Sequence, residues 1–152
     1  MCGRFTLLTE ERQIEERFQL QLDISLEKQY NIAPTQQVLA VTEEDGIRKA
    51  NLFRWGLIPF WSKDKKIGNK LINARAETLD EKPSFKYLIK RKRCLIVSDG
   101  FFEWKKEGDK KRPYFIYRED RNTFAFAGLW DVWKEADETI HSCTIVTTEP
   151  NE

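Results

Sequence analysis

The chain has 152 residues, of which 40% are hydrophobic and 34% are charged. That length and balance are typical of one globular domain with a substantial core, and they exclude a disordered chain. No apolar run approaches the ~20 residues of a membrane span, and the N-terminus lacks the apolar segment of a signal peptide. We therefore expect a cytoplasmic protein that does not associate with membranes.

The net charge is +1, so charge alone does not indicate nucleic-acid binding. The cations are nevertheless clustered in residues 63–66, 86–93 and 105–112. Clusters of this kind are most often solvated faces and turns, and a phosphate-binding face is the alternative. The sequence leaves both interpretations open.

The cysteine and histidine counts limit the chemistry further. Three cysteines, an odd number, argue against a disulfide framework. Cys94 and Cys143 lie in apolar, strand-like runs and are expected to be small buried hydrophobes. There is no Cys-x-x-Cys pair and only one histidine, His141, which we expect to be exposed to solvent. We expect neither a metal site nor a cofactor.

The first predicted element is a helix over residues 9–20. Thr9 can act as its N-cap, acidic residues suit its first turn, and Ile14 and Phe18 share one face. Residues 30–35 are predicted to form a turn-rich loop. A second, short helix is predicted to begin near Pro83, because proline suits the first turn of a helix.

Short strands joined by turns account for most of the remaining chain. They are predicted over residues 38–41, 47–55, 94–98, 101–105, 114–117, 123–129 and 139–147. Residues 56–70 are predicted to form a long irregular loop, which in a compact domain is often functional. The hairpin spacing predicts a single α+β domain with a curved, mostly antiparallel or barrel-like sheet flanked by helices.

Cys2 occupies the chemically most informative position. If Met1 is removed, Cys2 carries both a free α-amine and a thiol. The amine can condense with an aldehyde to an imine, and the thiol can then close on the imine carbon to form a five-membered thiazolidine. The same residue can instead act as an N-terminal nucleophile with its own amine as base. Retention of Met1 would make the placement accidental.

Two further segments carry polar groups that need partners. In residues 71–78, strand alternation places Asn73, Arg75 and Glu77 on one face. Such a set is costly to bury unpaired, so the segment is either functional or a solvent-facing strand. Glu103 lies between aromatic residues just after a buried strand, where a carboxylate can serve as general acid or base. An outward-facing position is the alternative for Glu103.

Residues 55–61 combine Trp55, Phe60 and Trp61 with a glycine and a proline. Aromatic side chains on such a loop can stack on nucleobases or wedge between them. Core packing is the alternative, and five tryptophans in the chain leave room for both.

Six motifs, taken in order, resemble the SRAP family, the SOS response-associated peptidase domain proteins that process abasic sites. The motifs are Met1-Cys2-Gly3-Arg4-Phe5, residues 30–35, residues 55–59, residues 72–78, Asp99-Gly100-Phe101-Phe102-Glu103-Trp104 and residues 145–147. Members of that family bind single-stranded DNA and join an N-terminal cysteine to an abasic site. The resemblance implies a β-barrel-like sheet surrounded by helices.

The resemblance also implies three catalytic residues. Cys2 matches the nucleophile that forms the thiazolidine, and Asn73 matches the amide that positions the reacting sugar. Glu103 matches the acidic residue that handles protons during ring opening and imine formation.

Five further positions are implied to bind DNA. Arg4 and Arg75 match phosphate-binding arginines, and a planar guanidinium suits phosphate because it can donate two parallel hydrogen bonds. Phe60 and Trp61 match an aromatic pair that wedges at a DNA junction, and Asn31 lies in a loop that helps line the site. The implied partner is single-stranded DNA with an abasic site, bound by a monomer.

One departure from the family pattern concerns a histidine. The family places a catalytic histidine beyond the strand that ends near Thr147, whereas this sequence stops at Glu152, and His141 lies upstream of that position. We therefore interpret residues 1–152 as one domain whose C-terminal portion is missing. Ring opening, crosslink reversal and strand cleavage would then proceed without the contribution of that histidine.

Three functions follow from the sequence. The leading one is covalent crosslinking to abasic sites, with abasic-site lyase activity as a side reaction. The second is an N-terminal-cysteine peptidase that removes its own Met1. The third is a non-catalytic module that binds single-stranded nucleic acid.

Overall fold

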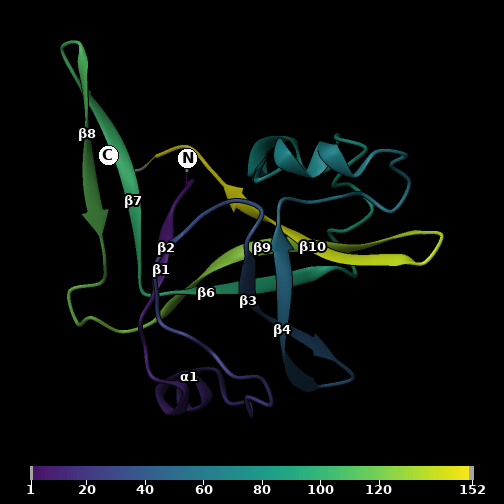
Figure 1. The fold of residues 1–152 in the computed structure, drawn as a ribbon, viewed down its shortest axis with the longest axis horizontal. Coiled ribbons are helices and arrows are strands. Elements are labelled where there is room, and N and C mark those ends of the chain that lie inside the picture. The colour runs from purple at the N-terminus through teal and green to yellow at the C-terminus, as the bar shows by residue number, and fades with distance from the viewer. Residues whose placement is uncertain (1, 151–152) are drawn as a thin grey trace.

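The structure, a computed structural model, describes residues 2–150 (Figure 1). Met1 lies outside the described residues, so the structure does not describe the removal of Met1 that the peptidase hypothesis includes. The strands are β1 (Phe5–Leu7), β2 (Gln29–Ile32), β3 (Gln37–Glu44), β4 (Ile47–Trp55), β5 (Asn73–Arg75), β6 (Arg93–Ser98), β7 (Gly100–Glu107), β8 (Lys110–Ile116), β9 (Phe124–Glu135) and β10 (Glu138–Thr147). The helices are α1 (Glu11–Phe18) and two 3₁₀ helices, Lys65–Asn69 and Ala76–Thr78.

Five strands close into a barrel. The larger sheet has the order β4-β3-β6-β9-β10-β5, and β10 also pairs with β4. The closing pair is parallel, with Ser142 opposite Arg54, and β5 pairs with β10 in parallel as well. The other strand pairs are antiparallel. The predicted single domain with a mostly antiparallel, barrel-like sheet is therefore confirmed.

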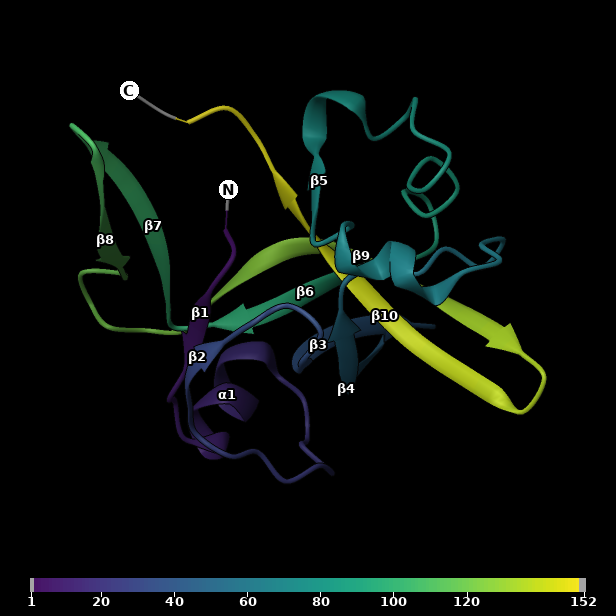
Figure 2. The same ribbon diagram turned by 45° about the horizontal axis from the view of Figure 1, so that its top comes forward.

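A second sheet, in the order β2-β1-β7-β8, lies beside the barrel (Figure 2). Its β1 strand pairs with β7, with Phe5 opposite Phe101. Phe5 also packs its ring against Trp55 of β4, with 5.1 Å between ring centroids. The start of the chain is thereby fixed between the two sheets.

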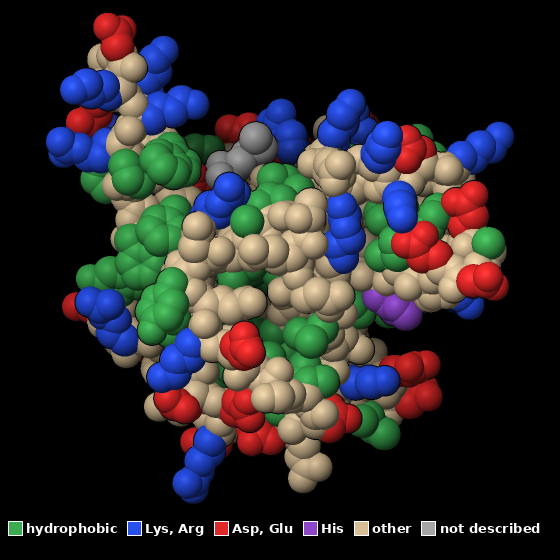
Figure 3. All heavy atoms as spheres, viewed as in Figure 1, with side chains coloured by type: hydrophobic (Ala, Val, Ile, Leu, Met, Phe, Trp, Pro, Cys, Tyr) green, Lys and Arg blue, Asp and Glu red, His purple; other side chains and the backbone are tan. Residues whose placement is uncertain are grey.

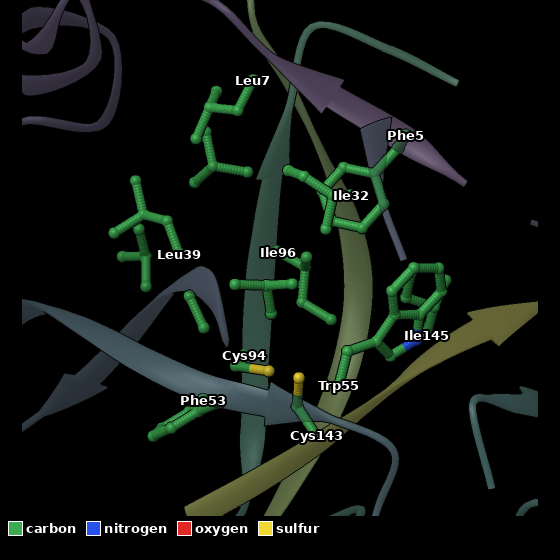
Figure 4. Packing of buried hydrophobic residues seen from close by; sticks show 14 of the residues in the cluster. Phe5, Leu7, Ile32, Leu39, Phe53, Trp55, Cys94, Ile96, Cys143 and Ile145 are labelled. Carbon is green, nitrogen blue, oxygen red and sulfur yellow. The ribbon is translucent and has the colours of Figure 1, made fainter. Parts of the chain in front are cut away.

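The hydrophobic core fills the barrel and the space between the two sheets (Figure 4). Phe5, Ile32, Trp55, Ile96 and Ile145 come from five different strands, and each is at most 1% exposed. Burial of apolar side chains this large stabilises the fold by roughly 1.5–3 kcal/mol each. The packed core therefore holds β1, and with it the neighbouring Cys2, in a fixed position.

Several local predictions are corrected by the structure. The helix over residues 9–20 exists as the shorter α1, with Ile14 buried as predicted. Glu10, not Thr9, is its N-cap, because the Thr9 hydroxyl donates to Asp99 instead. Residues 30–32 belong to β2 and are not a loop.

Helix is scarce in the part of the chain that the structure describes. The helix predicted near Pro83 is wrong, because this stretch is a run of turns held by the buried side chains of Phe85 and Leu88. The flanking helices thus reduce to α1 and two 3₁₀ helices. None of the helices in residues 2–150 has the length and apolarity that crossing a bilayer requires.

Candidate functional site around Cys2

The N-terminal strand is clamped to β7 by one carboxylate. Asp99 accepts hydrogen bonds from the Thr6 hydroxyl, from the backbone N–H groups of Leu8 and Thr9, and from the Thr9 hydroxyl. Asp99 lies directly before β7, so these bonds fix β1 against that strand. Sequence patterns did not single out Asp99 for this role, because its partners are about 90 residues away in the chain.

The pairing between β1 and β7 brings Glu103 close to Cys2. The backbone N–H of Phe102 donates to the Arg4 carbonyl at 3.0 Å, which continues the ladder beyond Phe5. One residue further, that register places Glu103 opposite Gly3. Glu103 is half-buried there, and its negative charge contributes to the raised pKa of the Cys2 thiol.

The Cys2 side chain is 5% exposed. Burial is the main cause that raises the pKa of its thiol to about 11, and the charge of Glu103 adds to the effect. The Sγ atom donates to the Arg4 carbonyl, with 3.7 Å between sulfur and oxygen. The thiol is therefore held as a neutral S–H group at physiological pH.

Asn73 connects Cys2 to the barrel. It lies on β5 opposite Ile145 of β10, and its Nδ2 donates to the Cys2 carbonyl at 3.2 Å. The same Nδ2 lies 3.1 Å from the Ile72 carbonyl, which also accepts from Trp55 Nε1 at 2.9 Å. The structure therefore brings Cys2, Asn73 and Glu103 together from three separate parts of the sequence.

Arg75 shares a strand with Asn73 but points to solvent. Its Nη2 lies 3.4 Å from Glu149 Oε1 and its Nε lies 4.0 Å from Glu77 Oε2. Glu77 is in the 3₁₀ helix that follows β5, so the prediction that it alternates with Asn73 and Arg75 on one strand face is wrong. Arg75 is nevertheless exposed, and a phosphate can reach its guanidinium in competition with these carboxylates.

Arg4 and Asn31 are also exposed. Arg4 donates through Nη1 to the Gly3 carbonyl at 2.7 Å, so its guanidinium is held next to the Cys2 backbone. Asn31 lies on β2 and not in a loop, and within residues 2–150 its side chain makes no hydrogen bond. The structure therefore places Arg4 at the site, whereas it shows no contact that ties Asn31 to it.

Phe60 and Trp61 project from the loop after β4, where they are 58% and 44% exposed. Trp55, in contrast, is fully buried, so core packing holds for Trp55 only. Two exposed aromatic side chains side by side on a loop are able to stack on a flat ligand.

A buried carboxylate holds that aromatic loop in place. Asp131 is 5% exposed, and its Oδ2 accepts from the Phe60 N–H at 2.8 Å. Burial raises the pKa of Asp131. Sequence reasoning missed this residue, although alternation along β9 puts it on the same buried side as Leu129 and Trp133. A buried carboxylate needs hydrogen-bond donors, so an aspartate on the apolar side of a strand was the sequence signal that could have identified Asp131.

Within residues 2–150, neither a cluster of metal ligands nor the cleft at Arg48 marks the site. Among residues 2–150, no group of three or more His, Cys, Asp or Glu side chains is placed to hold a metal ion. A cleft of about 350 Å³ is lined by residues that include Arg48, Lys90 and Arg93, but not by Cys2, Asn73 or Glu103. His141 is exposed as predicted, beside Phe53.

The family model for SOS response associated peptidase (SRAP) matches residues 1–152. The chain belongs to the SRAP family. It is similar to the abasic site processing protein YoqW of Bacillus subtilis (strain 168), with 46% identity over 157 residues, covering 100% of this chain and 70% of YoqW. It also resembles the abasic site processing protein YedK of Escherichia coli (strain K12), with 36% identity over 97% of this chain and 67% of YedK.

A solved structure matches the architecture. A crystal structure of a protein from Bacteroides thetaiotaomicron superimposes with a TM-score of 0.90 and 34% identity, covering 99% of this chain and 69% of that one. The resemblance to the SRAP family that the six motifs carried is thus confirmed, together with the barrel-like sheet that it implied.

Proposed function

We propose that this protein processes abasic sites in DNA by joining Cys2 covalently to the open aldehyde form of the abasic sugar. The observation that carries the proposal is the placement of the Asn73 amide and the Glu103 carboxylate around Cys2. SRAP relatives named as abasic site processing proteins support the same substrate.

The chemistry requires Cys2 with a free amine. Glu103 assists opening of the hemiacetal by moving a proton between the ring oxygen and the hydroxyl at the anomeric carbon. The Cys2 amine then attacks the aldehyde carbon, and one water leaves as the imine forms. The thiol adds to the imine carbon, so that a carbon–sulfur bond forms and the thiol proton passes to nitrogen. The product is a thiazolidine, equal to protein plus DNA minus one water.

Burial of the Cys2 side chain fits this order of steps, because burial favours the neutral thiol. A neutral S–H group does not compete with the amine for the aldehyde, and it supplies the proton that the ring nitrogen gains on closure. Asn73 fixes the Cys2 carbonyl, and therefore the direction of the amine and thiol. Holding reactants in place in this way contributes on the order of 7–11 kcal/mol in well-oriented cases.

The exposed residues around the site supply DNA contacts in this proposal. Arg4 and Arg75 bind phosphates on either side of the abasic nucleotide, and Phe60 with Trp61 blocks duplex on one side. An imine acidifies the neighbouring sugar carbon, so β-elimination and strand cleavage form a side reaction. Closure of the thiazolidine suppresses that reaction.

The test uses protein whose N-terminal processing has been verified by intact mass. It is incubated with single-stranded DNA that carries one abasic site, and with the same DNA after borohydride reduction of the aldehyde. We expect an adduct of protein plus DNA minus one water with the first DNA only. Cys2→Ala keeps an N-terminal amine and is expected to give no stable adduct and more strand cleavage, whereas Cys94→Ala serves as the matched cysteine control. The absence of an adduct with folded, processed protein overturns the proposal.

A peptidase that removes its own Met1 is the second candidate, in keeping with the family description. The protein with Met1 attached would perform that cleavage, and in it a thiol of pKa about 11 is ionised in only about one molecule in 10⁴ at pH 7. This argues against a thiolate nucleophile. Cleavage of a peptide panel in the absence of DNA would support the peptidase, and DNA binding without an adduct would support a binding module.

A further inference from the structure

The hairpin formed by β7 and β8 extends away from the body of the molecule (Figures 1 and 2). Its pairing runs from Phe101 opposite Ile116 to Glu107 opposite Lys110, and every residue of β8 is exposed. This hairpin also carries Glu103, so it begins at the candidate site and leads outward from it.

One face of the hairpin continues the surface on which Glu103 lies. Residues that alternate along a strand, and those directly opposite them, share a face. Tyr114 lies directly opposite Glu103 and is 41% exposed. Lys105 and its partner Arg112 follow, and then Lys110 at the turn. We call these four residues, Tyr114, Lys105, Arg112 and Lys110, the arm face.

Two contacts confirm that these side chains share one side. Glu107 accepts a hydrogen bond from the Tyr114 hydroxyl at 3.0 Å, and its other oxygen lies 3.6 Å from Arg112 Nε. Glu107 therefore directs the Tyr114 ring along the strand toward the turn. A half-exposed aromatic ring fixed at its hydroxyl end is a preformed surface for stacking.

The charge of this hairpin fits a polyanion. Residues 105–112 contain five Lys or Arg and two acidic residues, and Figure 3 shows basic side chains around the end of the hairpin. By the strand register, Lys105, Lys110 and Arg112 lie on the arm face together with Glu107, whereas Lys106 and Lys111 lie on the other face. Within residues 2–150, neither Lys105 nor Lys110 forms an ion pair. Like charges held on a narrow two-stranded arm repel one another unless an anion neutralises them.

A protein strand is a poor occupant of the same surface. β8 is the edge of its sheet, but it carries Pro113 and a series of cations. Proline and lysine on an edge strand discourage pairing with another chain. The combination of cations with an exposed aromatic ring instead matches the way proteins bind single strands, by charge along the backbone and stacking on bases.

We propose that the arm face binds the single strand on one side of the abasic nucleotide. Tyr114 stacks on the base next to the abasic sugar, and Lys105 and Lys110 bind phosphates further along. The inference rests on the proposed function, because Cys2 and Glu103 define where the abasic sugar lies.

The test measures affinity separately from crosslinking. Anisotropy titrations use DNA with a borohydride-reduced abasic site, which cannot crosslink, either short or extended by about ten nucleotides on the 5′ or the 3′ side. For the wild-type protein we expect tighter binding with one of the two extensions. In Lys105→Gln/Lys110→Gln that gain falls, and the slope of log affinity against log salt decreases by about 1.4, because two phosphate contacts on a single strand are lost.

The ring is tested by Tyr114→Ala, for which we expect a loss on the order of tenfold with the same extension. Tyr114→Phe keeps the ring and should retain most of the affinity. The matched charge control is Arg12→Gln/Arg17→Gln on α1, which lies far from the hairpin in both ribbon views (Figures 1 and 2). That control should leave the extension effect and the salt slope unchanged.

The experiment distinguishes failure of the arm face from failure of the proposed function. If the wild-type protein crosslinks a short abasic DNA but the hairpin variants bind extended DNA as it does, the arm face is refuted and the proposed function stands. If no crosslink forms, the proposed function fails, whatever the affinities. Because the altered side chains are exposed, circular dichroism is expected to show folded variants, and Lys105→Gln/Lys110→Gln should crosslink the short DNA at the wild-type rate.

Discussion

Cys2 and the pair Cys94 and Cys143 make an instructive comparison, because all three thiols are free and buried. Burial raises the pKa of each, to about 11 for Cys2 and about 12 for Cys94, and well above the ordinary value for Cys143. Cys94 and Cys143 point toward each other inside the barrel among apolar side chains (Figure 4). Judged only by their burial and their raised pKa values, all three thiols would be unreactive.

Cys2 differs from Cys94 and Cys143 in the polar groups that surround it. Asn73 donates to its backbone, Glu103 places a carboxylate beside it, and the guanidinium of Arg4 lies at the next carbonyl. Cys94 and Cys143 lie with Ile96 in the hydrophobic core, and burial is the main cause of their raised pKa values. Reactivity at Cys2 therefore depends on a few long-range contacts, and each of them can be removed singly.

The largest effect is expected from Glu103→Gln. Loss of the proton-transferring carboxylate should slow crosslinking about 100-fold, at the lower end of what general acid–base catalysis contributes. The same change removes a negative charge that raises the thiol pKa, so alkylation of Cys2 by iodoacetamide near pH 8 should become faster.

Slower crosslinking together with faster alkylation distinguishes a catalytic role of Glu103 from damage to the fold. Glu44→Gln, at the exposed end of β3, is the matched control and should leave both rates unchanged. A Glu103→Gln protein that crosslinks at the wild-type rate would remove Glu103 from the mechanism.

Asn73→Ala should give a smaller effect. It removes one hydrogen bond to the Cys2 carbonyl, worth about 1 kcal/mol, and should slow crosslinking about fivefold. Asn51→Ala deletes a comparable amide, bonded to Thr42 on the neighbouring strand, and should leave the rate unchanged. Single-turnover crosslinking measures both variants. Equal slowing in the two variants would mean that Asn73 acts only through stability.

The fold was largely readable from local patterns. The strands β3 and β4 were predicted at residues 38–41 and 47–55, and the structure places the turn between them at Asp45 and Gly46. The helix predicted near Pro83 was wrong, because a proline suits a turn as well as a helix start. Closure of the barrel was also beyond local reasoning, since the β4–β10 pair joins residues about 90 positions apart.

The site was readable only in part. Cys2, Asn73 and Glu103 were candidates because a thiol, an amide and a carboxylate occurred in recognisable motifs. Asp99, which fixes β1, and Asp131, which holds the loop of Phe60, were not candidates, because each is defined by a partner that tertiary structure brings to it. Tyr114 is a similar case, since only the register of β7 with β8 places it opposite Glu103.

The core cysteines give an effect that is absent at neutral pH. The unfolded thiol of Cys94 has an ordinary pKa of 9.0, and the folded thiol a pKa of about 12. Between these values the unfolded chain has lost the proton that the folded protein retains. Stability is therefore complete below about pH 9 and falls as pH rises, by about 1.4 kcal/mol per pH unit for each such thiol.

Cys94→Ala should flatten that dependence by one thiol. Urea unfolding between pH 9 and about pH 11 measures the slope, which is independent of any constant loss from the smaller side chain. Cys2→Ala should flatten it over a narrower range, because the folded thiol of Cys2 already ionises near pH 11. Parallel curves for wild type and Cys94→Ala would contradict the burial of that thiol. A flatter slope in Cys94→Ala with undiminished crosslinking would show that burial and reactivity are set independently in this fold.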